Sequence, residues 1–348
     1  MLVTGVTGFI GAELARQLLE DGHRVRGTTR DVEAARVAGH VTALPGAGER
    51  LDLVGADVLD VGSLAQSVRG CEYVMHVASP YVLNVVDPER DLLRPAVEGT
   101  TAMLDAAARS DGVRRVVLTS SFVAMMGDPR GRVFTEDDWN DQATLDTNPY
   151  AYSKTAAERA AWDFMDRVRP QFDLVVINPA QVIGPTLVPR ANQTHEWFVG
   201  LTNGSQPAIV SYDFPTIDVR DVARLHVRAM DMEDATGRHL AAAWNMSHRQ
   251  IVEIGRRLGF DSKYGFPRLS LDNPAGNLLA RVAIRFQPRG TRDYLEGTLG
   301  RQFDVDNSKA RHLLGRDFLP VGESIEDTWV SLDRWGLLGA QSLETASD

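Results

Sequence analysis

The feature that most constrains the fold of this chain is the glycine-rich segment Thr4–Gly11, which reads TGVTGFIG. A short apolar run precedes it, and Ala12–Leu19 follows with the apolar spacing of a helix. In a strand–turn–helix unit, Gly5 permits the tight turn, Gly8 lets the backbone approach a pyrophosphate, and Gly11 lets the helix pack closely. The segment therefore predicts a dinucleotide site with the phosphates at the helix N-terminus. The alternative is a structural glycine turn without a ligand.

Strand-like and helix-like stretches alternate through the first half of the chain. This alternation is typical of βαβ units, so we expect an α/β fold with a Rossmann-type, doubly wound parallel sheet. The expected strands are Met1–Thr4, Arg24–Thr28, Val54–Val58, Tyr73–Val77, Val116–Ser120 and Leu174–Ile177, and further helices are expected at Leu64–Val68, Ala96–Ala108 and Ala151–Val168.

The pattern changes after Pro179, where proline, glycine, asparagine and aromatic residues become frequent and the elements shorten. We expect residues 1–179 to form the nucleotide-binding domain, with 216–239 returning to it. Residues 180–215 and 240–343 are expected to form a smaller C-terminal substrate-binding cap and the elements that close the chain. The last helices are expected near Ser308–Leu314 and Ile325–Trp335.

Composition excludes several other classes of protein. The 348 residues carry a formal net charge of -10, which argues against a nucleic-acid binder. No apolar run approaches the roughly 20 residues that cross a bilayer, and we see no secretion signal, so we expect no membrane association. Cys71 is the only cysteine, which rules out an intrachain disulfide and favours a reducing cytoplasm. Metal-ligand spacing of Cys and His is absent, so no metal site is expected. We expect a monomer or a homodimer.

The end of the second expected strand bears on which dinucleotide binds. An acid usually stands there in NAD enzymes, where it binds the ribose 2′-hydroxyl. Here the strand ends without an acid and Arg30 follows, whose guanidinium suits a 2′-phosphate; Arg36 is a second candidate contact. This predicts NADP(H) in preference to NAD(H). In the alternative interpretation, Arg30 is a solvated surface residue and Asp31 binds the sugar.

Two later strand ends are also expected to contact the cofactor. Asp57 and Val58, after the third strand, would flank the adenine. Val77, Ala78 and Ser79, after the fourth, would pass beside the phosphates and the ribose.

Tyr150 and Lys154 stand four residues apart at the start of an expected helix, so their side chains share a face. A lysine cation about 4 Å from a tyrosine stabilises the phenolate by roughly 4 kcal/mol at an intermediate dielectric. That brings a group of ordinary pKa near 10 into the range useful for proton transfer. Ser120 and Ser121 end the preceding strand, where a hydroxyl can hydrogen-bond a substrate carbonyl oxygen. Turn or cap formation is the other common role of such serines.

Taken together, these motifs resemble the extended short-chain dehydrogenases/reductases. Within them the chain is most similar to the branch of dihydroflavonol reductases, cinnamoyl-CoA reductases and yeast-type aldehyde or methylglyoxal reductases. The resemblance covers nearly the whole chain. The matching segments include Thr4–Gly11, Arg30-Asp31, Gly55–Asp57, His76–Pro80, Val97–Thr100, Val116–Ser121, Tyr150–Lys154, Asn178-Pro179, Gly184-Pro185, Asp218–Ala223, Phe303-Asp304 and Asn307–Ala310.

The resemblance implies a catalytic set of Ser121, Tyr150 and Lys154, with Ser120 as the alternative serine. It also implies that Pro179 brings backbone groups to the nicotinamide carboxamide. The full set of residues expected to contact the cofactor is Gly5, Thr7, Gly8, Phe9, Ile10, Gly11, Arg30, Arg36, Asp57, Val58, Val77, Ala78, Ser79, Ser120, Tyr150, Lys154, Pro179 and Val182.

The expected activity is NADPH-dependent reduction of a small carbonyl compound, or oxidation of the corresponding secondary alcohol. One alternative is a nucleotide-sugar epimerase or dehydratase that keeps NAD bound. Another, from a different class, is a regulatory protein that senses NADP(H) without chemistry.

Two departures from the family pattern stand out. Only three residues precede Thr4, so we expect a short first strand or a natural start upstream of Met1. Plant dihydroflavonol reductases carry an asparagine shortly after the catalytic serine, whereas Phe122–Met126 is apolar throughout, which favours a fairly apolar aldehyde or ketone. Residues expected to line the substrate site, with core packing as the alternative, are Tyr81, Phe122, Met126, Trp197 and Phe214.

A basic stretch in the C-terminal half is interpreted as a solvated surface rather than a diphosphate or CoA site. It comprises Arg281, Arg285, Arg289, Arg292 and Arg301.

Overall fold

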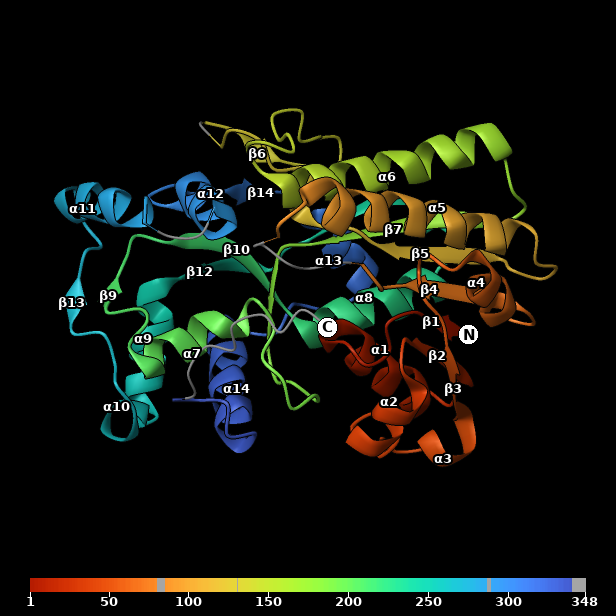
Figure 1. Cartoon of the computed structure of the whole chain (residues 1–348), viewed down its shortest axis with the longest axis horizontal. Coiled ribbons are helices and arrows are strands. Elements are labelled where there is room, and N and C mark those ends of the chain that lie inside the picture. The colour runs from red at the N-terminus through yellow and green to blue at the C-terminus, as the bar shows by residue number, and fades with distance from the viewer. Residues whose placement is uncertain (80–84, 130, 287–288, 340–348) are drawn as a thin grey trace.

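A seven-stranded parallel sheet forms the centre of the protein in a computed structural model (Figure 1), which describes residues 1–79, 85–129, 131–286 and 289–339. The strand order is β11-β7-β5-β4-β1-β2-β3, and every neighbouring pair is parallel. The strands are β1 (Leu2–Val3), β2 (Val25–Thr29), β3 (Leu51–Gly55), β4 (Tyr73–His76), β5 (Arg115–Thr119), β7 (Asp173–Pro179) and β11 (Gly237–Ala241). The predicted Rossmann-type α/β fold is therefore confirmed.

Helices cover both faces of this sheet (Figure 1). One face carries α1 (Phe9–Glu20), α8 (Val219–Asp231) and α13 (Ser308–Leu314), and the other carries α4 (Val61–Val68), α5 (Arg94–Ala108) and α6 (Pro149–Val168). The strands supply both cores because their side chains alternate: Val117 packs toward α1 and α8, whereas Val116 and Leu118 pack toward α5 and α6.

The chain order reverses between β1 and β4. From β1 the sheet grows to β2 and β3 on one side, and from β4 it grows to β5, β7 and β11 on the other. The loops after β1 and β4 therefore diverge and leave a crevice at the carboxyl ends of these strands, which is where open α/β sheets bind ligands.

The third strand differs from the sequence prediction. We expected Val54–Val58, but β3 spans Leu51–Gly55 and pairs with β2 through Val25 and Leu51. The strand lies at the edge of the sheet and is only partly buried, so Asp52 is tolerated within it. That charge interrupts the apolar run on which the prediction relied.

The second part of the molecule contains two small sheets, β12-β10-β8 and β13-β9, and its β14 pairs with β6 of the first part. Its helices pack around an aromatic core in which Phe198 meets Trp329 with 5.1 Å between ring centres. Within the predicted return segment 216–239, α8 packs against the large sheet and β11 is one of its strands. The first three residues of the segment belong instead to β10. The strands of the small sheets are β6 (Val133–Phe134), β8 (Gln181–Ile183), β9 (Ala208–Ile209), β10 (Asp213–Asp218), β12 (Trp244–Ser247), β13 (Leu269–Ser270) and β14 (Asp304–Val305). The helices of the second part are α7 (His195–Asn203), α9 (His248–Arg257), α10 (Phe260–Lys263), α11 (Pro274–Ile284), α12 (Arg289–Thr298) and α14 (Val321–Arg334).

Four short elements complete the described chain: α2 (Val32–Ala38), α3 (Ala47–Arg50), the π-helical turn η1 (Glu89–Leu93) and the 3-10 turn η2 (Phe122–Ala124). None of the helices within the described ranges has the length and apolar character needed to cross a membrane.

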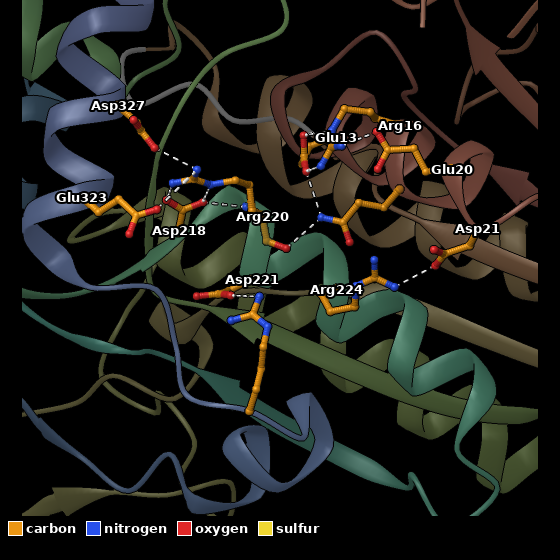
Figure 2. Close-up of polar contacts among 12 residues, drawn as sticks. Glu13, Arg16, Glu20, Asp21, Asp218, Arg220, Asp221, Arg224, Glu323 and Asp327 are labelled. Atoms are coloured by element: carbon orange, nitrogen blue, oxygen red, sulfur yellow. Dashed lines mark hydrogen bonds and ion pairs between the residues drawn. The ribbon is translucent and has the colours of Figure 1, made fainter. Parts of the chain in front are cut away.

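A polar junction joins the two parts of the molecule (Figure 2). Arg220, at the start of α8, contacts the fully buried Asp218 through Nε and Nη2 at 2.9 and 2.8 Å. Its Nη1 lies 2.8 Å from Asp327 on α14. The carbonyl oxygen of Arg220 also accepts a hydrogen bond from Gln17 of α1 at 2.9 Å. One residue of α8 thus contacts both the glycine-turn helix and the last helix.

Candidate active site

The turn after β1 is held in place by a threonine that the sequence reasoning did not single out. Thr4 Oγ1 accepts hydrogen bonds from the backbone N–H groups of Val77 at 3.0 Å and Ala78 at 2.9 Å, which fastens the end of β1 to the end of β4. Gly5 has φ +66°, a left-handed conformation that favours glycine. A Cβ on Gly11 would lie 2.2 Å from the Gly5 carbonyl oxygen, so only glycine allows this close packing of helix on turn.

The N-terminus of α1 has the properties of an anion site. Gly8 is the N-cap and provides no side-chain cap, and the first turn contains no acidic residue. The N–H groups of Phe9, Ile10 and Gly11 have no carbonyl partner within the helix because they belong to its first turn. Thr7, Gly8, Phe9 and Ile10 are partly exposed, so this end is open to a ligand. The arrangement fits the pyrophosphate of a dinucleotide.

At the end of β2, the three candidate residues have different surroundings. Arg30 is exposed and forms no ion pair with the described residues, whereas Arg36 pairs with Glu33 at 2.7 Å. Asp31 is the N-cap of α2, and its carboxylate accepts a hydrogen bond from the Ala34 N–H at 2.9 Å. Arg30 therefore has its guanidinium available for a phosphate, while Asp31 already has a structural partner.

The adenine end of the predicted site lies just beyond β3. Asp57 is exposed, and its carboxylate accepts a hydrogen bond from the Leu59 N–H at 2.8 Å. Val58 packs against α5, where a Cβ added to Gly99 would lie 2.9 Å from the Cβ of Val58.

Tyr150 and Lys154 lie on the first two turns of α6. The helix begins at Pro149, and its N-cap Asn148 accepts a hydrogen bond from the Ala151 N–H at 3.0 Å. Lys154 Nζ donates to Ser79 Oγ at 2.8 Å and lies 5.8 Å from the centre of the Tyr150 ring. The lysine is buried, and this burial lowers its pKa to about 8. The residues after β4 and the start of α6 are thus brought together.

The two serines after β5 have different partners. The Ser120 hydroxyl is buried and donates to the carboxylate of Glu158. Ser121 is half-buried at the start of η2, where its Oγ accepts from the Val123 N–H at 3.3 Å. The Ser120 proton is engaged inside the protein, which favours Ser121 as the hydroxyl for a substrate.

A small, partly open cavity adjoins Lys154 between β4, β5, α5 and α6. Its lining is mostly polar, and it includes Glu158 and His76, neither of which was among the predicted site residues. Burial lowers the pKa of His76 to about 4, and the Lys154 cation contributes to this lowering, so the imidazole is neutral at pH 7. Its Nδ1 lies 3.0 Å from Thr4 Oγ1. The lining residues are His76, Ala78, Ser79, Thr100, Leu118, Thr119, Ser120, Lys154, Ala157 and Glu158.

Residues predicted to line the substrate site are mostly inside the protein. Phe122 and Phe214 are almost fully buried and lie 6.0 Å apart in an edge-on contact, which is the packing alternative. Met126 is also buried, whereas Trp197 is partly exposed and lies 4.4 Å from Tyr212 between ring centres. Tyr81 falls outside the described residues. Contact of any of these residues with substrate stays a prediction.

Pro179 and Val182 follow the Tyr–Lys helix into the second part of the molecule. Pro179 ends β7 and is buried, and Val182 lies in β8 and is partly exposed. The imidazole of His195, at the start of α7, meets the Phe9 ring edge-on with 4.7 Å between ring centres. The second part therefore reaches the glycine turn directly.

Two arginines of the basic stretch have separate partners. Arg281 donates to the Leu299 carbonyl oxygen at 3.2 Å, and Arg292 lies 3.4 Å from Asp293. The side chain of Arg289 lies outside the described residues. Across the part of the chain that the structure describes, His, Cys, Asp and Glu form no group of three or more that could hold a metal ion.

The model of the NAD dependent epimerase/dehydratase family matches residues 1–246. The chain belongs to this family. Its members are the extended short-chain dehydrogenases/reductases, and the protein is accordingly an NAD(P)-dependent oxidoreductase. Cinnamoyl-CoA reductase CAD2 of Medicago truncatula is 35% identical over 336 residues, which cover 95% of this chain and 94% of that protein. Tetraketide alpha-pyrone reductase 1 of Arabidopsis thaliana is 34% identical and covers 72% of this chain and 78% of its own length.

Solved structures of family members share the fold over almost the whole chain. The yeast methylglyoxal/isovaleraldehyde reductase Gre2, complexed with NADPH, superposes with a TM-score of 0.78 at 26% identity and covers 97% of this chain and 99% of its own. Vestitone reductase from alfalfa (Medicago sativa) superposes with a TM-score of 0.74 at 25% identity, covering 97% and 99% of the two chains. The resemblance to the extended short-chain dehydrogenases/reductases is thus confirmed.

Proposed function

We propose that this protein is an NADPH-dependent carbonyl reductase that acts on a small, fairly apolar aldehyde or ketone, or on the corresponding secondary alcohol in reverse. The observation that carries the proposal is the buried Lys154 ammonium beside Tyr150 on α6, the helix that contacts the turn η2 capped by Ser121. The names of the relatives support it, since they include a cinnamoyl-CoA reductase, a methylglyoxal/isovaleraldehyde reductase and a vestitone reductase.

The residues present fit a bound dinucleotide. The glycine turn leaves no space for a Cβ at Gly11, and the first turn of α1 offers unpaired N–H groups. Arg30, free of an ion pair within the described chain, would hold a 2′-phosphate and supports NADPH over NADH. Lys154 and Ser79 would lie at the nicotinamide ribose. When bound, the reduced nicotinamide supplies the hydride.

The side chains then perform the proton transfer. Ser121 donates a hydrogen bond to the substrate carbonyl oxygen and orients it toward Tyr150. The Tyr150 hydroxyl gives its proton to that oxygen as the oxygen becomes an alkoxide. The Lys154 cation stabilises the resulting phenolate, and its burial strengthens that interaction because little water screens it. In the reverse direction the phenolate takes the proton of the alcohol.

The test is turnover of aldehydes, diketones, ketoesters and aryl ketones followed by NADPH absorbance, with Tyr150→Phe as the diagnostic variant. We expect the variant to lose roughly 10²- to 10⁴-fold in kcat and to keep its NADPH affinity, because only the proton donor is removed. Tyr152→Phe, on the same helix, is the matched control and should retain activity. Near-normal turnover by Tyr150→Phe would refute the proposal, and tightly bound NAD with nucleotide-sugar turnover would support the epimerase alternative.

Cys71, a free and buried cysteine, suits the cytoplasm that we propose as the location.

A further inference from the structure

Glu158, on α6, is a buried carboxylate that the proposed chemistry leaves without a role. The residue is 1% exposed and accepts hydrogen bonds from four side chains. Oε2 accepts from Asn178 Nδ2 at 2.6 Å and from the Ser120 hydroxyl, and Oε1 accepts from Arg238 Nε at 2.5 Å and from Trp162 Nε1 at 3.4 Å. All four partners donate, so both carboxylate oxygens are saturated within the protein.

Arg238, on β11, neutralises this carboxylate and is itself 8% exposed. Its Nη1 donates to the carbonyl oxygens of Glu136 at 2.8 Å and Asp138 at 2.5 Å. Its guanidinium lies over the Trp139 ring, 3.9 Å from the centre. Buried ion pairs contribute little net stability, because desolvation offsets their attraction. A role other than stability is therefore needed to explain why two charges are placed inside this part of the protein.

The location of Glu158 suggests that role. It stands one helical turn after Lys154 and two turns after Tyr150 on the same face of α6. Its partner Asn178 also donates to the backbone carbonyl oxygen of Ser121 at 3.3 Å. The carboxylate thus connects the helix that carries Tyr150 and Lys154 to the strand end that carries Ser121.

We propose that Glu158 is a positioning residue, which fixes the distance between the Ser121 hydroxyl and Tyr150 by anchoring Ser120 and Asn178 to α6. It also commits the Ser120 hydroxyl to the interior, so that Ser121 alone faces substrate. This inference rests on the proposed function, since it names what holds that catalytic set in place. A carboxylate suits the task because it accepts on both oxygens, whereas a glutamine would turn an N–H toward Arg238 or toward Asn178.

The variants are Glu158→Gln, which keeps the shape, and Asn178→Leu, which cuts the connection to Ser121 but leaves the ion pair. Glu13→Gln is the matched control, because Glu13 is also a buried helical glutamate (3% exposed) paired with an arginine, and it lies on α1. We expect Glu158→Gln to lower kcat for a carbonyl substrate by about ten- to a hundredfold, since small misplacements have effects of this order. The NADPH dissociation constant of Glu158→Gln should stay within about twofold of wild type. The activity of the control Glu13→Gln should also stay within about twofold of wild type.

A double-mutant cycle with Ser121→Ala separates positioning from general structural damage. If Glu158 acts through Ser121, the loss from Glu158→Gln becomes small once Ser121 is alanine. If the double variant instead loses the product of the two single-variant losses in kcat, the proposal is overturned. If neither Glu158→Gln nor Asn178→Leu folds, as judged by circular dichroism, the network serves folding and the proposal is also overturned.

A crystal structure of Glu158→Gln gives a readout that needs no turnover. We expect Ser121 Oγ to shift relative to the Tyr150 hydroxyl; an unchanged separation would overturn the inference.

The outcomes distinguish the two proposals. An active wild type with an inactive Tyr150→Phe and a normal Glu158→Gln refutes the positioning role alone, whereas a wild type that reduces no carbonyl refutes the proposed function and leaves the structural comparison to decide.

Discussion

At the scale of single residues, Lys154 is the group whose surroundings change its chemistry most directly. Burial lowers its pKa to about 8, so the ammonium is present at neutral pH and is lost as the pH rises through that value. The neutral amine no longer stabilises the Tyr150 phenolate. We therefore expect kcat/KM for carbonyl reduction to fall above about pH 8.

A pH profile of kcat/KM from pH 6 to 10 checks this, with Lys154→Arg measured in parallel. An arginine keeps its charge over the whole range. The variant should be slower, but its activity should decline only at higher pH. A decline at the same pH in both proteins would assign the titration to another group.

Arg30 gives a second prediction at this scale. Replacing it with serine removes the candidate partner of the 2′-phosphate, and hydrogen bonds to charged groups contribute about 1.5–3 kcal/mol. We expect the KM for NADPH to rise roughly ten- to a hundredfold and the KM for NADH to stay nearly constant. Arg36→Ser, measured in parallel, tests the second candidate contact, whose guanidinium pairs with Glu33. Equal losses with both cofactors would contradict the assignment.

At the scale of elements, the polar junction of α8 with α14 makes a prediction about stability (Figure 2). Arg220→Met leaves Asp218 buried with a backbone N–H but without its cation. Because the arginine is itself partly exposed, with 24% of its side chain accessible, we expect a loss of about 2 kcal/mol, below the full effect of breaking a buried pair.

Urea denaturation measures this loss of free energy of unfolding. The control is Arg257→Met, which breaks an exposed contact with Glu326 on the same helix α14 and should change stability by at most about 0.5 kcal/mol. Equal effects of the two substitutions would show that the junction does not depend on burial.

The elements that sequence reasoning predicted well are the buried ones. The core strands β5 and β7 carry unbroken apolar runs, so each was placed to within about two residues. The exposed edge strand β3 was placed three residues late, because Asp52 interrupts its pattern. The spacing of apolar residues reflects which side chains are buried, so it does not place a strand well when that strand is only partly buried.

At the scale of the whole molecule, the candidate site divides into a local part and a part assembled by the fold. Tyr150 with Lys154, and the glycine turn, lie within single segments, so their spacing can be read directly. Glu158 could not be found in this way. A glutamate on a helix normally faces solvent. The donors that distinguish Glu158 come from the residue after β5 and from β7 and β11, which only the finished sheet brings together.

The position of β11 at the edge of the sheet has a consequence for the growing chain on the ribosome. Domains tend to fold from the N-terminus as they emerge. Tyr150, Lys154 and Glu158 emerge on α6 well before Arg238, which arrives with the last strand to join the sheet. Until then the Glu158 carboxylate lacks its cation, and burying it alone is strongly unfavourable. Chains truncated before Gly237 should therefore leave α6 open to limited proteolysis, which would make completion of the helix that carries Tyr150 and Lys154 a late event in synthesis.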